Sequence, residues 1–146
     1  MDLPKKKLIN LCGKYQIKLM VIFGSFITEY FNHQSDIDLA VLATDINLIK
    51  DNKSIILKKL GNLFEHREID LILLNHADPL LKFNIAAEGK IIYEKETGIY
   101  NKFKVRAMNE HNDAKKFYKL DKKYINDFLK RSENNGQQRV SPPQAK

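Results

Sequence analysis

The sequence is poor in residues that crosslink a chain or bind transition metals. Its 146 residues contain one cysteine, four histidines and no tryptophan. A single cysteine excludes an internal disulfide, and the Cys and His residues do not have the spacing of a zinc site. Cys12 lies in LCGK without a neighbouring base, so we expect a small buried side chain rather than a nucleophile.

Long apolar runs are also absent. No run approaches the roughly 18 to 20 residues of a membrane span, and the lysines of MDLPKKKLIN are not followed by an uninterrupted apolar segment. We therefore expect a cytoplasmic protein without a membrane partner. The apolar content of 43% in 146 residues is enough for one compact domain with its own core.

Acidic residues are scarce in the last third of the chain. Residues 1–96 hold 13 basic and 13 acidic residues, whereas residues 97–146 hold 12 basic and 5 acidic residues and carry the whole net charge of +7. This asymmetry predicts a body with a basic arm that meets an acidic partner, a nucleic acid or only solvent. Nucleic acid is the weakest of these, because the arm lacks the regular aromatic interleaving of a single-strand platform.

Strand-like and helical patterns alternate over the first two thirds of the chain. The expected strands are 17–23, 37–43, 68–74 and a short edge strand at 90–94. The expected helices are one after Pro4, then 25–32, 46–64, 79–88, and 97–131 with a break near His111 and Asn112. The pattern predicts an α/β (α+β) fold, a β-sheet covered by helices. We expect a body at 1–96, a helical C-terminal extension at 97–131 and a flexible tail at 132–146.

Two acidic residues open the second expected strand. Asp36 and Asp38 project from the same face of a strand, where two carboxylates oppose each other's ionisation. A divalent cation removes this conflict, and Mg²⁺ commonly takes one or two carboxylates together with phosphate oxygens. Asp70, in the third strand, is the natural third ligand, and Glu68 on the same face competes with it. This pattern predicts a metal site that serves a nucleotide.

A Gly-Ser pair ends the first expected strand. Gly24 lets the backbone approach a ligand closely, and a helix that opens at Ser25 presents free N–H groups to an anion. Taken singly, the pair is explained by a capped turn and the two acids by a solvated loop. Their occurrence together, with ten residues between Ser25 and Asp36 and a further acid on another strand, favours a phosphate cradle that faces a metal site.

The stretch GSFITEYFNHQSDIDLAV resembles the signature of the DNA polymerase beta-like nucleotidyltransferase superfamily, and REIDLILLNHADPLLKFNIAAEGKIIYE resembles its minimal nucleotidyltransferases, the MNT family. The resemblance covers residues 16–95. It implies a mixed sheet with packed helices, Gly24 and Ser25 on the triphosphate of ATP, Asp36 and Asp38 on two Mg²⁺ ions, and Asp70 as the third carboxylate, both catalytic and metal-binding. The Arg and Gly that many MNT sequences carry after Gly-Ser are replaced at 26–30, and Lys18 is a candidate substitute.

The same resemblance implies an antitoxin. Members of the MNT family transfer AMP from ATP to a tyrosine of a partner HEPN-domain ribonuclease toxin and silence it. Size agrees, because a chain of this length lacks a separate domain for tRNA or an antibiotic. The alternatives are nucleotidyl transfer to a small hydroxylated molecule such as an aminoglycoside, and a catalytically idle module that binds the toxin.

An apolar stripe runs along the expected C-terminal helix. Phe117, Leu120, Tyr124 and Phe128 recur at helical spacing among basic residues. The stripe is explained either by a helix that packs on its own core or by a surface that binds a partner.

Overall fold

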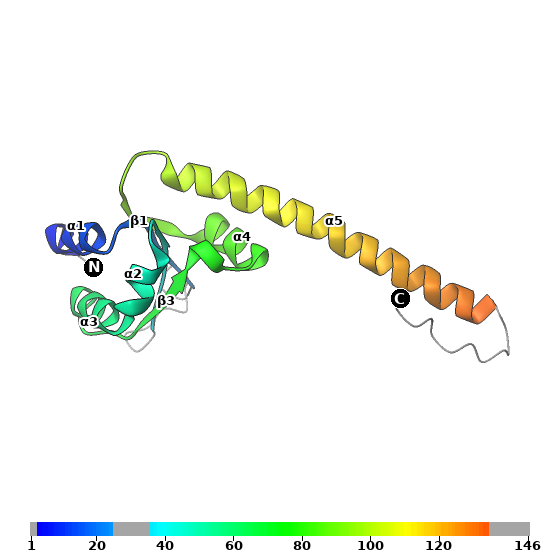
Figure 1. Cartoon of the computed structure of the whole chain (residues 1–146), viewed down its shortest axis with the longest axis horizontal. Helices are drawn as coiled ribbons and strands as arrows, with labels where there is room; N and C mark the ends of the chain where they lie inside the picture. Colours follow the sequence, from blue (N-terminus) through cyan, green and yellow to red (C-terminus); the bar gives the residue numbers. More distant parts are fainter. Residues whose placement is uncertain (1–2, 25–35, 135–146) are drawn as a thin grey trace. The chain divides into compact units, whose positions relative to one another are not determined.

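The computed structural model describes residues 3–24 and 36–134, which form two compact units (Figure 1). The first unit extends to His111, and the second begins at Asn112. The strands are β1 (Ile17–Phe23), β2 (Ile37–Ala43), β3 (Ile69–Leu73) and β4 (Lys90–Glu94). The helices are α1 (Lys5–Lys14), α2 (Ile46–Asp51), α3 (Lys53–Leu63), a 3-10 turn (Leu74–His76), α4 (Pro79–Glu88) and α5 (Ile99–Asn134).

The four strands form one mixed sheet in the order β3-β2-β1-β4. β2 runs parallel to β3, while β1 runs antiparallel to both of its neighbours, β2 and β4. After β3 ends at Leu73, the side chain of Asn75 continues the pairing with β2, since it accepts from the Ala43 N–H at 3.0 Å and donates to the Ala43 carbonyl at 2.9 Å. The expected helix-covered mixed sheet and the edge position of β4 are thus confirmed.

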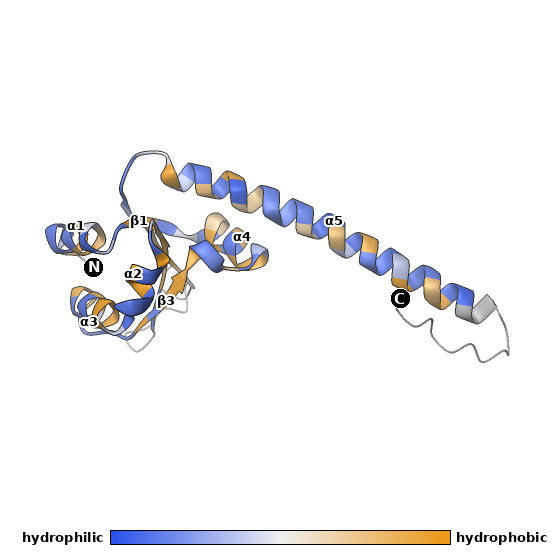
Figure 2. Ribbon diagram, viewed as in Figure 1, coloured by the Kyte–Doolittle hydropathy of each residue, from blue (hydrophilic) through white to orange (hydrophobic). Residues whose placement is uncertain are grey.

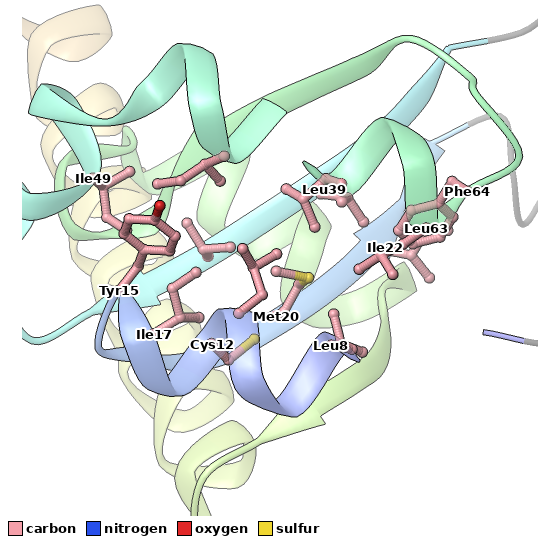
Figure 3. Packing of buried hydrophobic residues seen from close by; sticks show 14 of the residues in the cluster. Leu8, Cys12, Tyr15, Ile17, Met20, Ile22, Leu39, Ile49, Leu63 and Phe64 are labelled. Carbon is pink, nitrogen blue, oxygen red and sulfur yellow. The ribbon is translucent and has the colours of Figure 1, made fainter. Parts of the chain in front are cut away.

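One face of the sheet is covered by α1, α2 and α3. Figure 3 shows Leu8 and Cys12 of α1, and Tyr15 directly after it, beside strand side chains such as Met20. Every second residue of β2 belongs to this cluster, namely Ile37, Leu39, Val41 and Ala43. Cys12 is fully buried there, and burial raises the pKa of its thiol from 9.0 to about 12. The expectation of a small buried side chain is confirmed, and a thiol that stays neutral is a poor nucleophile.

The other face of the sheet is covered by α4 and the first turns of α5. Its cluster takes Leu19 and Val21 from β1, Ala40 from β2, and Ile85 from α4. From α5 it takes the buried residues Tyr100, Phe103 and Ala107. The first three turns of α5 therefore complete the core of the body, which reaches past residue 96 to His111.

Two expected helices differ from those observed. The expected helix 46–64 divides at Asn52, whose φ of −117° leaves the helical range and whose side chain donates to the Leu48 carbonyl at 2.8 Å. The expected break at His111 and Asn112 is wrong, because α5 is continuous from Ile99 to Asn134. The expected helix 25–32 lies outside the described residues. No helix in the described part of the chain combines the length and the apolarity that a membrane crossing needs.

Tyr100 ties α5 to the end of α4. Its hydroxyl lies 3.3, 3.2 and 3.1 Å from the carbonyl oxygens of Ile85, Ala86 and Gly89, at the end of α4. The Ile85 carbonyl also accepts from the Gly89 N–H at 2.8 Å. Its backbone N–H donates to the Glu94 carboxylate at 2.8 Å. Burial raises the pKa of the Tyr100 hydroxyl, so the group stays a donor over a wider pH range than a free tyrosine.

We predict that Tyr100→Phe lowers the free energy of unfolding at neutral pH by about 1 kcal/mol, the usual contribution of one hydrogen bond. The folded protein holds this proton more tightly than the unfolded chain. The contribution is therefore complete below about pH 10, the pKa of a free tyrosine, and is lost as the pH rises through the folded-state pKa. Urea titrations between pH 7 and 11 measure both effects, with Tyr118→Phe at an exposed position as the control. Parallel stability curves for Tyr100→Phe and the wild type would contradict this prediction.

Candidate active site

The carboxylates expected to bind metal lie at one end of the sheet, where β1 ends and both β2 and β3 begin. The register of the parallel pair makes Asp38 of β2 and Asp70 of β3 Cα partners. On its other side, Asp38 is the Cα partner of Phe23, the last residue of β1. Side chains at paired positions point to the same face, so Asp38 and Asp70 stand side by side on strands about 4.8 Å apart.

The acid pair occupies the edge of the second core face. Two residues further along each strand, and hence on the same face, Ala40 and Ile72 belong to the cluster under α4 and α5. Asp38 is half-buried and Asp70 is exposed. The apolar cover thus reaches Ala40 and Ile72 but not the acids two residues earlier, so the two carboxylates stay in contact with solvent.

Gly24 packs directly against Asp38. Its φ of +74° falls in the left-handed region that glycine adopts without steric penalty. A Cβ atom built on Gly24 would overlap Oδ2 of Asp38. A side chain at this position would therefore push the Asp38 carboxylate aside, and its absence lets the backbone after β1 pass close to the acid. The expected role of Gly24 on a triphosphate stays a prediction.

Two further acids stand at the entrance of the strands. Asp36 is exposed and immediately precedes β2, on the face of Asp38. Glu68 is also exposed, and its carbonyl accepts from the Ile37 N–H at 2.9 Å, so it lies one register step outside Asp70. The register therefore puts Asp70, not its expected competitor Glu68, opposite Asp38.

The donor set fits an ion that is held jointly with a nucleotide. In the described part of the chain, no three Asp, Glu, His or Cys side chains converge closely enough to hold a metal ion alone. Mg²⁺ does not require such a cage, since it commonly binds one or two carboxylates and completes its shell with water and substrate phosphates. Paired oxygen donors from Asp38 and Asp70, with Asp36 beside them, have this chemistry.

Lys18, the candidate substitute for a phosphate-binding arginine, lies at the opposite end of β1. Its carbonyl accepts from the Lys95 N–H at 2.8 Å. Phe23 is five positions further along the strand, a distance of about 16 Å. Lys18 lines a cavity of about 480 Å³ with Lys95 and Arg106. Another cavity, of about 370 Å³, lies between α1 and α3. Neither cavity is lined by the acid pair, so Lys18 does not serve that site.

Phe23 is the neighbour of the acids that the sequence did not single out. It pairs with Asp38 and packs, half-buried, against the second cluster, which closes the β1 side of the acid. The sequence indicates this position of Phe23 only in that Phe23 is the last apolar residue before Gly24. Ser25 lies outside the described residues, and its expected role stays a prediction.

Comparison with known proteins identifies the family of this chain. Residues 6–98 match the family model of the polymerase beta nucleotidyltransferases. The chain is 33% identical over 123 residues to protein adenylyltransferase MntA of Aphanizomenon flos-aquae (strain 2012/KM1/D3). That similarity covers 79% of this chain and 82% of the relative.

Solved structures show the same fold. A toxin–antitoxin crystal structure with AMP-PNP matches with a TM-score of 0.60 and 25% identity, over 82% of this chain and 98% of that chain. An MNT antitoxin in complex with tri-AMPylated Shewanella oneidensis HEPN toxin matches with a TM-score of 0.54 and 24% identity, over 81% and 93% of the two chains. From the family match, the curated relative and the acid-bearing mixed sheet, we conclude that the chain belongs to the polymerase beta nucleotidyltransferase family, among the MntA-type minimal nucleotidyltransferases.

Proposed function

We propose that this chain is an antitoxin that transfers AMP from ATP to a tyrosine hydroxyl of a HEPN-type toxin. The observation that carries the proposal is the Asp38–Asp70 pair, held in register on neighbouring strands with Gly24 against it. Paired carboxylates of this kind can hold a metal ion together with a phosphate group. The relative MntA is a protein adenylyltransferase. AMP-PNP in a matched toxin–antitoxin structure supports ATP as the nucleotide.

In the proposed reaction, the tyrosine oxygen bonds to the α-phosphorus of ATP, and the bond from that phosphorus to the bridging oxygen breaks. Pyrophosphate leaves with the electron pair of the broken bond. The Asp70 carboxylate accepts the proton of the attacking hydroxyl. Asp70 is exposed, so a hydroxyl group can reach it. Gly24 and Ser25 hold the triphosphate through backbone N–H groups and the serine hydroxyl.

Asp36, Asp38 and Asp70 would hold Mg²⁺. The resemblance to the family implies two ions. When bound, Mg²⁺ neutralises charge that develops on the phosphate oxygens and helps to orient them. The register of β2 and β3 fixes the two central carboxylates before any ligand arrives, so ordering them costs little during the reaction.

Two other functions compete with this one. Transfer to a small hydroxylated molecule would use the same acids, and a catalytically idle antitoxin would bind the toxin without them. The protein adenylyltransferase relative favours a protein acceptor, and the intact acid pair favours catalysis. Labelled ATP separates the three, because the label ends on the toxin, on a small product, or on neither.

We predict that Asp38→Asn abolishes AMP transfer while the protein stays folded. Loss of one carboxylate removes a metal ligand worth several kcal/mol in the transition state, so we expect the rate to fall at least about 100-fold. The free energy of unfolding should change little, because the substitution keeps the shape of a side chain that is only half-buried. Asp36→Asn should behave alike, and excess chelator should stop the wild type.

Intact-mass measurement of the toxin, with urea unfolding of each variant, checks this prediction. Asp51→Asn is the matched control, since Asp51 is an exposed aspartate on α2, which covers the opposite face of the sheet. Full transfer by Asp38→Asn, or full wild-type activity in chelator, would refute the assignment of the acids.

We predict that Gly24→Ala impairs transfer beyond its effect on stability. The new methyl group must displace the Asp38 carboxylate, and the positive φ costs about 1 to 2 kcal/mol in addition. We expect a transfer rate at least tenfold lower, roughly the effect of a misplaced catalytic group.

Gly98→Ala is the control for this substitution. Gly98 also has a positive φ, +103°, but a Cβ there meets no atom within 4 Å. It should lose similar stability and keep its transfer rate per folded molecule. Equal transfer rates in the two variants would show that the packing of Gly24 on Asp38 is unimportant.

A further inference from the structure

The part of α5 beyond the body carries a row of exposed apolar side chains. We call residues 112–131 the arm, and its exposed apolar residues the arm stripe: Phe117, Tyr118, Leu120, Tyr124, Ile125 and Leu129. These six side chains are between 54% and 72% exposed. Three of them are aromatic, and large exposed aromatic groups in one patch are typical of interaction sites.

The arm is amphipathic. At 3.6 residues per turn, the arm stripe falls within roughly one half of the helix circumference. The lysines fall in the other half, at positions 115, 116, 119, 122, 123 and 130. Hydrophobic and hydrophilic residues both recur along this part of α5 (Figure 2). The arm therefore has an apolar face and a separate basic face.

The start of α5 is different, because its apolar residues are already in use. Tyr100, Phe103 and Ala107 are buried in the body. At the last turn of the body, Lys82 forms an ion pair with Glu110 at 3.2 Å, and the rings of Phe83 and His111 stack with centroids 4.0 Å apart. Packing on the chain's own core thus explains α5 up to His111 and leaves the arm stripe unexplained.

The matches to relatives extend into the arm. The similarity to MntA covers 79% of the 146 residues, and the toxin–antitoxin structure with AMP-PNP covers 82%. Either share exceeds the 111 residues of the body. Proteins that occur in toxin–antitoxin complexes therefore share more with this chain than the nucleotidyltransferase body.

We propose that the arm stripe is the docking surface for the HEPN-type toxin, an inference that rests on the function proposed above. The apolar half of the arm lies against an apolar groove or helix of the toxin, as an amphipathic helix does in helix-in-groove recognition. The lysines of the other half remain in solvent and speed the encounter with an acidic partner. Docking holds the acceptor tyrosine at high local concentration near the nucleotide.

A second copy of this chain fits the arm stripe less well than the toxin. Helices that pair with themselves favour Leu, Ile or Val at the seam, whereas the stripe holds Phe117, Tyr118 and Tyr124. Asp121 falls within the same half of the helix. Parallel self-pairing would therefore bring two aspartates together away from water, which is unfavourable. Tyrosine is among the residues that contribute most to protein–protein interfaces, which suits a partner other than a second copy of this chain.

The test uses the full-length chain and its cognate toxin, co-expressed and then measured by titration. The arm variant is Phe117→Ala with Tyr124→Ala. The control is Val105→Ala with Met108→Ala, which removes two exposed apolar side chains from α5 outside the stripe. Each chain is assayed for toxin affinity, AMP transfer and binding of a non-hydrolysable ATP analogue.

We expect the arm variant to bind the toxin at least tenfold more weakly, while the control binds like the wild type. Transfer by the arm variant should fall by the same factor at low toxin concentration and recover at saturating toxin, with analogue binding unchanged. Wild-type affinity in the arm variant would overturn the proposal. A stripe-dependent dimer of the isolated chain, with unaltered toxin affinity, would overturn it in favour of self-association.

The same assays separate this inference from the proposed function. If the wild type binds the toxin through the arm stripe but labels nothing, the docking surface stands and the transferase function fails. If the wild type labels the toxin and the arm variant labels it equally well at every concentration, the function stands and the docking surface fails.

Discussion

The in-register pairing of β2 with β3 is the interaction on which the site depends. It makes Asp38 and Asp70 neighbours, and a slip of one residue would turn Asp70 to the other face of the sheet. The register is held by apolar side chains on the opposite face, where Leu39 and Val41 of β2 are buried and Leu71 and Leu73 of β3 pack against the same cluster. The core under α1 to α3 thus fixes the geometry of acids on the other face.

The two faces of β2 explain how charged groups are tolerated at the edge of a buried strand. Ala40 is buried beneath α4 and α5, and Asp38, two residues earlier, is half-buried. Burying both acids would cost several kcal/mol for each charge, so the apolar cover has to stop at this step. Gly24 lies against Asp38, where a Cβ atom would overlap the carboxylate. The half-buried Asp38 and the exposed Asp70 therefore lie at the edge of the apolar cover.

α5 serves two purposes with one continuous helix. Its first turns bury Tyr100, Phe103 and Ala107 and complete the second core, so the body cannot be separated from α5 at residue 96 without opening that core. Beyond His111 the helix continues to Asn134, and none of the described residues in this part belongs to the buried core of the body. The proposed function requires a body that modifies the substrate protein and a surface that holds it. The first turns of α5 belong to the body, and the arm carries the proposed docking surface.

Short-range pattern was enough to predict the four strands, the mixed-sheet fold through its signature, the buried Cys12, and the acids Asp36 and Asp38 on one face. Strand alternation and helical spacing are local properties, so they can be recognised without the fold. Pairing between distant segments is visible only in the folded protein. It put Asp70 rather than Glu68 opposite Asp38, brought Phe23 beside the acids, and moved Lys18 to the far end of the sheet. Register is set by packing across the whole sheet, and no local spacing encodes it.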